Sequence, residues 1–180
     1  MIYNILTKLK LILNEGVKSS FGLVKDIVEI SSITKEKKEG RVLITLLNIE
    51  RDTSAGINFK SRAGLSVSNK VIQGNPSWSI NLLVLVSVVF PSSGYESSLK
   101  IMDLVLGILQ RNHQLNLPNS TEYLIIEPVN VSISELSNIW SICSSDLNPS
   151  IVLRIRSFNV DGNGVMQIHQ EIKERILDLC

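Results

Sequence analysis

Few residues in this chain are suited to acid–base or metal chemistry. Its 180 residues include two histidines, His113 and His169, and two cysteines, Cys143 and Cys180. A zinc site needs several Cys or His ligands at close spacing, such as Cys-x-x-Cys or His-x-x-x-His, and neither pattern occurs. We therefore predict no metal site. Two isolated thiols also favour a reduced, intracellular protein, in which Cys143 is a small core residue.

Motifs for nucleophilic catalysis and nucleotide binding are missing as well. The sequence contains no Gly-x-Ser-x-Gly elbow, no phosphate-binding Gly-x-x-x-x-Gly-Lys-Ser/Thr and no Gly-x-Gly-x-x-Gly. Residues 161–164, Asp-Gly-Asn-Gly, lack the later ligands of a calcium loop and predict a turn. We predict that the protein is not an enzyme and needs no cofactor. An unrecognised active site using His113 or His169 remains the alternative.

The charge balance argues against two classes of partner. The formal net charge is +1, whereas nucleic-acid-binding proteins usually carry a clear basic excess. The longest apolar run, Ile80 to Phe90, is about half the length of a membrane helix. The N-terminus also lacks the order of charge, apolar stretch and cleavage site of a signal peptide. We predict no nucleic-acid partner, no membrane partner and no targeting segment.

The N-terminal half predicts a helix, a hairpin and a long loop. Apolar residues from Ile2 to Leu13 recur at helical spacing, and Gly16 either ends this helix or only weakens it. Asp26–Ile33 and Arg41–Arg51 are rich in β-branched residues and predict a β-hairpin around a charged turn. Thr53–Ser77 predicts a long loop, with a short strand near residues 65–67. The loop carries three basic residues and no acidic one: Lys60, Arg62 and Lys70.

A buried strand and two helix starts follow. Trp78–Phe90 is apolar on both faces, which is typical of a central strand. Residues 93–96 and 132–135 each have the Ser-x-x-Glu form of a capping box, and they predict helices that run to about Arg111 and Cys143. Val131 and Leu136 predict a hydrophobic staple at the second helix. We also predict that Trp78 and Trp140 belong to the core.

The C-terminal third predicts two more strands and a tail. Glu122–Val131 predicts a strand. Because proline lacks a backbone N–H, Pro128 predicts that this strand, or its Pro128 end, lies at a sheet edge. Ile151–Asn159 alternates, with Arg154 and Arg156 on the outer face. These arginines form either a solvated sheet face or a charged subunit contact. The tail from residue 165 fits an amphipathic helix or a short extended arm.

The order of these elements predicts an α+β fold with helices packed on a mixed, mainly antiparallel sheet. We predict one domain over residues 1–160 and a C-terminal tail or arm over residues 161–180 that contributes to an interface.

Four stretches, taken in order and spacing, resemble a known family. They are 42–50 (VLITLLNIE), 76–90 with the following Tyr95-Glu96, 133–140 (ISELSNIW) and the strand start at 149–152 (PSIV). Over residues 1–160 the chain is similar to the N-terminal domain of the cap, or tail-terminator, proteins of phage-tail-like contractile injection systems. The resemblance implies a tail-terminator-like fold and a structural role.

What the resemblance further implies is a hexameric ring on the distal end of a tube and sheath. The implied partners are the chain itself, the terminal sheath subunits and the terminal inner-tube subunits. Assembly would take place in the bacterial cytoplasm, within a particle that is then either released or held by the cell. The alternatives are a phage or prophage tail terminator or neck protein, and an unrelated monomeric adaptor domain.

A head-to-tail ring needs two different patches on each subunit, and a sheath end can be completed by strand addition. The strand near Pro128 and the tail are the candidate edges, and the basic loop is a candidate for facing a neighbour or the lumen. The candidate interface residues come from the basic loop, the arginine pair and the tail: Lys60, Arg62, Lys70, Arg154, Arg156, Ile168, Ile172 and Ile176.

Overall fold

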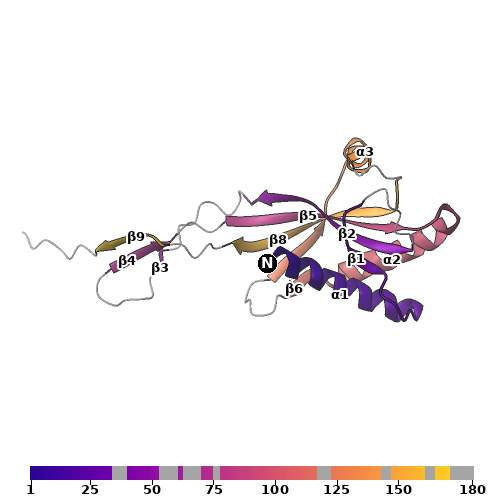
Figure 1. Cartoon of the computed structure of the whole chain (residues 1–180), viewed down its shortest axis with the longest axis horizontal. Coiled ribbons are helices and arrows are strands. Elements are labelled where there is room, and N and C mark those ends of the chain that lie inside the picture. Colours follow the sequence, from indigo (N-terminus) through magenta and orange to yellow (C-terminus); the bar gives the residue numbers. More distant parts are fainter. Residues whose placement is uncertain are drawn as a thin grey trace, which may run out of the picture. The chain divides into compact units, whose positions relative to one another are not determined.

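A computed structural model describes most of the chain, and Figure 1 shows its elements. The described residues are 1–33, 40–52, 61–62, 70–74, 78–116, 123–142, 147–160 and 165–170. The helices are α1 (Ile2–Phe21), α2 (Tyr95–Arg111) and α3 (Ile133–Ile142), with a 3-10 turn, η1 (Ser92–Gly94), before α2. The strands are β1 (Val28–Ile30), β2 (Arg41–Arg51), β3 (Ser61–Arg62), β4 (Lys70–Gly74), β5 (Trp78–Val89), β6 (Gln114–Asn116), β7 (Tyr123–Pro128), β8 (Ser150–Val160) and β9 (Val165–Gln170).

Within the described residues the strands form two sheets. The larger sheet has the order β1-β2-β5-β8-β7-β6, and the smaller has the order β3-β4-β9. β1 pairs with β2 in parallel, whereas β6–β7 and β7–β8 are antiparallel. The predicted α+β class with a mixed, mainly antiparallel sheet is therefore confirmed.

β5 lies inside the larger sheet, as its two apolar faces predict. Residues Leu82, Val84, Leu85, Val86 and Val88 are buried. α1 and α2 cover one face of this sheet and α3 lies on the other (Figure 1). Beneath α3, Trp140 joins a cluster of Ile33, Leu43, Leu85, Val89 and Val152. Each face of the central strands therefore has its own apolar layer.

Gly16 continues α1 instead of ending it. The helix runs on to Phe21 and stops at Gly22, whose φ of 61° is the left-handed conformation of a helix C-cap. A Cβ built at Gly16 would lie 2.4 Å from Cδ1 of Ile108 in α2. Gly16 therefore allows α1 and α2 to approach closely.

The predicted hairpin between residues 26–33 and 41–51 is wrong. β1 runs parallel to β2, with Val28 opposite Val42 and Ile30 opposite Ile44. β1 is one of the two edge strands of the larger sheet, and the buried Asn14 of α1 accepts hydrogen bonds from the backbone N–H groups of Ile27 (3.2 Å) and Val28 (3.4 Å). A run of β-branched residues indicates a strand but does not indicate the direction in which that strand pairs. In this structure β1 is parallel to β2, and it is also hydrogen-bonded to Asn14 of α1.

The predicted loop 53–77 is wrong in part, because it contains β3 and β4. β4 pairs antiparallel with both β3 and β9. β3 lies shortly before β4 in the sequence, whereas β9 lies far after it. Residues 165–170 thus take the extended alternative for the tail, not the helical one. The expected short strand at 65–67 and the turn at 161–164 lie outside the described residues.

The chain divides into two compact units that differ from the predicted division at residue 160. Unit 1 holds residues 1–50 and 81–158, and unit 2 holds residues 51–80 and 159–180. The pairing of β4 with β9 groups the tail with the segment before β5. Each unit is considered by itself below.

The two predicted capping boxes have different outcomes. At α3, the backbone N–H of Ser132 donates to Glu135 Oε2 (2.8 Å), and the N–H of Glu135 donates to Ser132 Oγ (3.3 Å). Val131 and Leu136, the predicted staple, both pack against the cluster under α3. At α2 the first box is wrong, because η1 carries the chain into the helix and Gly94 is the N-cap, with no side-chain cap bond.

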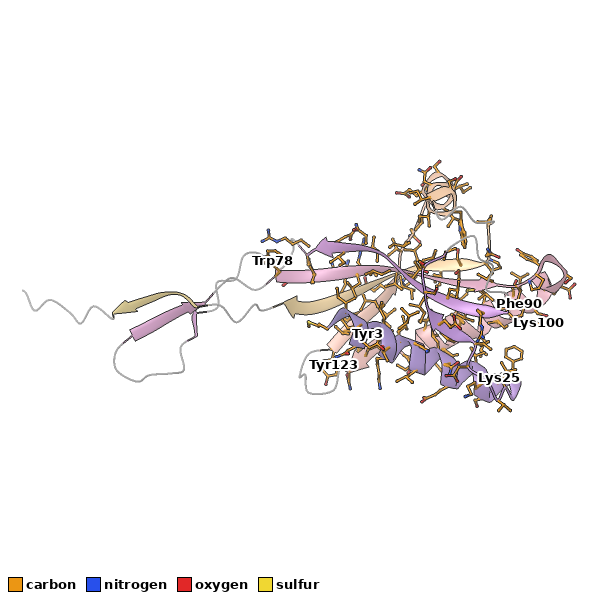
Figure 2. The ribbon with its side chains drawn as sticks, in the orientation of Figure 1. Tyr3, Lys25, Trp78, Phe90, Lys100 and Tyr123 are labelled. Carbon is orange, nitrogen blue, oxygen red and sulfur yellow. The ribbon has the colours of Figure 1, made fainter. Side chains whose placement is uncertain are left out.

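The two tryptophans also differ. Trp140 is only 3% exposed, as predicted, whereas Trp78 at the start of β5 is 63% exposed (Figure 2). The prediction that Trp78 belongs to the core is therefore wrong.

Candidate interaction surfaces

Unit 2 brings together predicted interface residues that lie far apart in the sequence. Arg62 of β3 and Ile168 of β9 are both register partners of Ile72 in β4, one on each side. Lys70 is the register partner of Gln170. The predicted basic segment and the predicted tail therefore share one antiparallel sheet. Lys60, Ile172 and Ile176 lie outside the described residues.

The arginine pair of β8 lies in unit 1, on the face that also carries α3. Val152 of β8 packs into the cluster under α3, and alternation along the strand puts Arg154 and Arg156 on that same face. Arg154 Nη2 lies 3.8 Å from Glu50 Oε2, and Arg156 Nε lies 3.2 Å from Glu127 Oε2. The predicted alternation is confirmed, and each arginine has a carboxylate neighbour.

These ion pairs leave hydrogen-bonding capacity unused. The Nε atoms of Arg154 and Arg156 are buried and have no hydrogen-bond partner within the described part of the chain, since the short Arg156–Glu127 approach is poorly aligned. The same holds for Oδ1 of Asn81, a buried residue of β5. Partly exposed pairs of this kind contribute only about 0–1 kcal/mol to stability. The Arg154 and Arg156 side chains nevertheless remain 30% and 42% exposed, and this exposed part can meet carboxylate or carbonyl acceptors of a partner.

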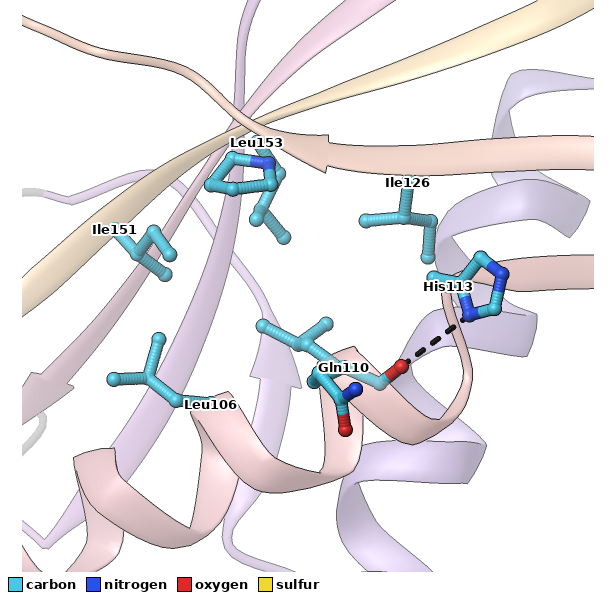
Figure 3. Close-up of a pocket in the computed structure, with 8 residues that line it drawn as sticks. Leu106, Gln110, His113, Ile126, Ile151 and Leu153 are labelled. Carbon is cyan, nitrogen blue, oxygen red and sulfur yellow. Dashed lines mark hydrogen bonds between the residues drawn. The ribbon is translucent and has the colours of Figure 1, made fainter.

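An apolar pocket opens on the opposite face of the same sheet, between α2, β7 and β8 (Figure 3). It has a volume of about 410 Å³. Two polar residues, Gln110 and His113, line it near the end of α2, and the other lining residues are apolar. The full lining is Leu106, Leu109, Gln110, His113, Ile126, Pro128, Ile151 and Leu153. His113 Nδ1 lies 3.3 Å from the carbonyl oxygen of Gln110.

The strand β7 meets this pocket at its proline end. β6 pairs with residues 123–125 of β7, and the Ile126 N–H donates to the His113 carbonyl, so β6 stops short of Pro128. This confirms the expectation that the Pro128 end lies at an edge. The pocket itself was not predicted, because its walls come from three separate segments that each read as ordinary core.

The α3 region carries exposed apolar side chains that the sequence analysis also missed. Ile142 at the end of α3 is 84% exposed, and Leu147 just before β8 is 68% exposed. Ile133 at the start of α3 is 88% exposed, next to the Ser132–Glu135 cap. The signal available in the sequence was a ten-residue helix with isoleucines at both ends, of which the structure buries only Trp140.

Chemistry-bearing clusters are not found among the residues that the structure describes. No group of three or more His, Cys, Asp or Glu side chains there is placed to hold a metal ion. Nor is any described helix long and apolar enough to cross a membrane. The surfaces of unit 1 are instead an arginine-bearing face, an apolar pocket and an apolar protrusion.

A protein-family model described as the Pvc16 N-terminal domain matches residues 4–173. The chain belongs to the Pvc16 N-terminal domain family. Together with the two structures described next, this match confirms the resemblance to the N-terminal domain of cap proteins of contractile injection systems, and the match extends beyond residue 160 through β9. No curated protein matches the chain.

Two solved structures share the fold of this Pvc16 N-terminal domain. One is the sheath/tube terminator of an extracellular contractile injection system, PVC, in its extended state, with 18% identity and a TM-score of 0.58 over 100% of the chain. The other is the tube-terminating cap of the anti-feeding prophage, with 14% identity and a TM-score of 0.55 over 96% of the chain. The chain spans 65% and 60% of the lengths of these two proteins.

Proposed function

We propose that this chain is the structural cap, or the N-terminal part of the cap, that terminates the tube and sheath of a contractile phage-tail-like injection particle. One observation carries the proposal. The whole chain shares its fold with a sheath/tube terminator, and the family model spans residues 4–173. The second similar structure is also a tube-terminating cap.

The proposed partners are other copies of the chain, the terminal sheath subunits and the terminal inner-tube subunits. A closed ring of head-to-tail subunits, six in our proposal, would stop polymerisation because it covers the end to which the next layer would add. The work is done by contacts and not by bond chemistry, so the proposed protein is not an enzyme and takes no cofactor. We place assembly in the bacterial cytoplasm, followed by residence in the particle.

Two surfaces are proposed for these contacts. The partly exposed side chains of Arg154 and Arg156 offer guanidinium donors to acceptors on a partner. In unit 2, the sheet edge formed by β9 is suited to strand addition, which uses main-chain hydrogen bonds. Lys60, Arg62, Lys70, Ile168, Ile172 and Ile176 belong to this second proposed surface.

Deleting the gene in the source bacterium and imaging its particles by electron microscopy tests the function. We expect loss of uniform sheathed particles, or tubes and sheaths of uncontrolled length, because nothing then stops or secures the growing end. Restoring the gene should restore a defined end. Particles of normal length, number and end structure in the deletion strain would refute the cap role.

A further inference from the structure

We propose that the ring closes when the apolar protrusion of one copy, Ile142 with Leu147, enters the apolar pocket of the next copy. This inference rests on the proposed function, because it specifies a contact within the proposed ring. The occupant is a second copy of this chain. The pocket is the hollow of about 410 Å³ lined by Leu106, Leu153 and their neighbours.

One chain cannot bury its own protrusion in its own pocket. Leu153 of β8 lines the pocket, while the adjacent Val152 packs under α3. Successive side chains of a strand point to opposite faces, so the pocket and α3 lie on opposite sides of the sheet. Figure 1 shows the same arrangement, with α2 on one side and α3 on the other.

The protrusion and the pocket are both unfavourable when they are left in water. Ile142 is 84% exposed and Leu147 is 68% exposed, although both are large aliphatic residues. The pocket walls are mostly aliphatic, and Leu106 at the pocket is 39% exposed. Large exposed apolar features on a protein surface commonly mark contact sites. Burying the protrusion in the pocket removes both from water.

A protrusion and a complementary pocket at different places on one chain make a heterologous contact, which repeats head to tail and forms a ring when the rotation closes. The same chain therefore supplies both of the different patches that a ring needs. Ile142 and Leu147 are both exposed and lie close together in the sequence, whereas Ile133 lies beside the charged Ser132–Glu135 cap of α3. The contact is therefore assigned to Ile142 and Leu147.

Two charge-introducing variants test the contact. Ile142→Asp alters the protrusion, and Leu106→Asp alters the pocket wall. Both side chains are exposed, so we expect both variants to keep the wild-type fold, and circular dichroism checks this. We expect each variant alone to lose self-association by roughly tenfold or more in analytical ultracentrifugation. Ile133→Asp is the matched control on the same helix and should associate like the wild type.

Mixing the two variants gives the sharpest result. The Ile142→Asp chain keeps its pocket and the Leu106→Asp chain keeps its protrusion, so a 1:1 mixture should form heterodimers and stop there. Mixtures that stay monomeric, or single variants that associate like the wild type, would overturn the proposal. A small apolar molecule found in the wild-type pocket by native mass spectrometry, with association unchanged in both variants, would overturn it too.

A crosslink provides a second measurement that does not depend on the strength of association. In a background of Cys143→Ser and Cys180→Ser, the pair Ile142→Cys and Leu106→Cys should give intermolecular disulfide ladders on mild oxidation. The control pair Ile133→Cys and Leu106→Cys should not, and equal yields from both pairs would refute the contact. Failure here with a positive gene-deletion phenotype rejects this contact and keeps the cap role, whereas normal particles after deletion reject the cap role itself.

Discussion

At the scale of single residues, Gly16 and Gly107 are mid-helix glycines in opposite situations. A Cβ at Gly16 would lie 2.4 Å from Cδ1 and 2.9 Å from Cγ1 of the buried Ile108. A Cβ at Gly107 would meet only the Arg111 guanidinium, at 3.5 Å. Helix propensity favours alanine at both by up to about 1 kcal/mol, so the neighbours decide the sign of each substitution.

We expect Gly16→Ala to lower the free energy of unfolding by about 1 kcal/mol, because the overpacking cost of about 1–3 kcal/mol exceeds the propensity gain. Gly107→Ala, the matched control, should raise it by about 0.5–1 kcal/mol. Urea denaturation measures both. Adding Ile108→Val removes Cδ1, the nearer of the two clashing atoms, and should recover part of the Gly16→Ala loss. A stabilising Gly16→Ala would show that α2 can shift away.

Asn14 is a second single residue with a defined task, since its Oδ1 serves two backbone N–H groups at the β1 edge. Asn14→Ala should cost about 1–3 kcal/mol, because buried donors lose their partner. Hydrogen exchange should accelerate at Ile27 and Val28 more than at the buried amides of β5. Unchanged exchange at these two amides would show that another acceptor replaces Asn14.

At the scale of elements, α3 shows how a local sequence signal leads to a measurable pH dependence. The backbone and hydroxyl of Ser132 donate to Glu135, and these hydrogen bonds lower the pKa of that carboxyl from its ordinary 4.5. A lowered folded-state pKa means that the stabilisation is present above the unfolded value and is lost as pH falls through the folded one.

We therefore expect the wild type to lose stability below about pH 4.5, and Glu135→Gln to lose less over the same range. Denaturation series at pH 6 and pH 3 on both proteins give the comparison. Asp26, whose pKa is lowered by its hydrogen bond to Lys18, has the same sign and remains in both proteins. Identical pH slopes for the two proteins would mean that the cap is not maintained in solution.

Elements whose signals are local were predictable, and those fixed by distant partners were not. The α3 capping box, the central strand β5 and the alternation of β8 follow from residues close in sequence. The parallel direction of β1, and the strands β3 and β4 in a segment rich in Gly and Ser, depend on partners elsewhere in the chain. The pocket could not be predicted from the sequence for the same reason, because its lining residues come together only when α2, β7 and β8 pack against one another.

At the scale of the whole molecule, the near-neutral charge hides an uneven distribution. The net charge is +1, yet the segment 53–77 contains Lys60, Arg62 and Lys70 without an acidic residue. Two of these three residues lie in the sheet that also contains β9, a predicted interface strand. If this segment faces a sheath or tube partner, its charge acts mainly on the rate and specificity of docking and less on the fold.

Reversing these three charges to glutamate separates a specific surface from a general charge effect. The variant would carry a net charge of −5, because each reversal changes the +1 total by two. A control that reverses Lys25, Lys100 and Arg111 reaches the same −5 from unit 1. In a deletion strain complemented with each variant, we expect fewer capped particles only with the first, because local complementarity and not total charge steers docking. If both variants lose capped particles equally, the effect is due to net charge. If both restore capped particles equally, the basic segment does not belong to the proposed interface. The contact through Ile142 is tested separately, by its own crosslink.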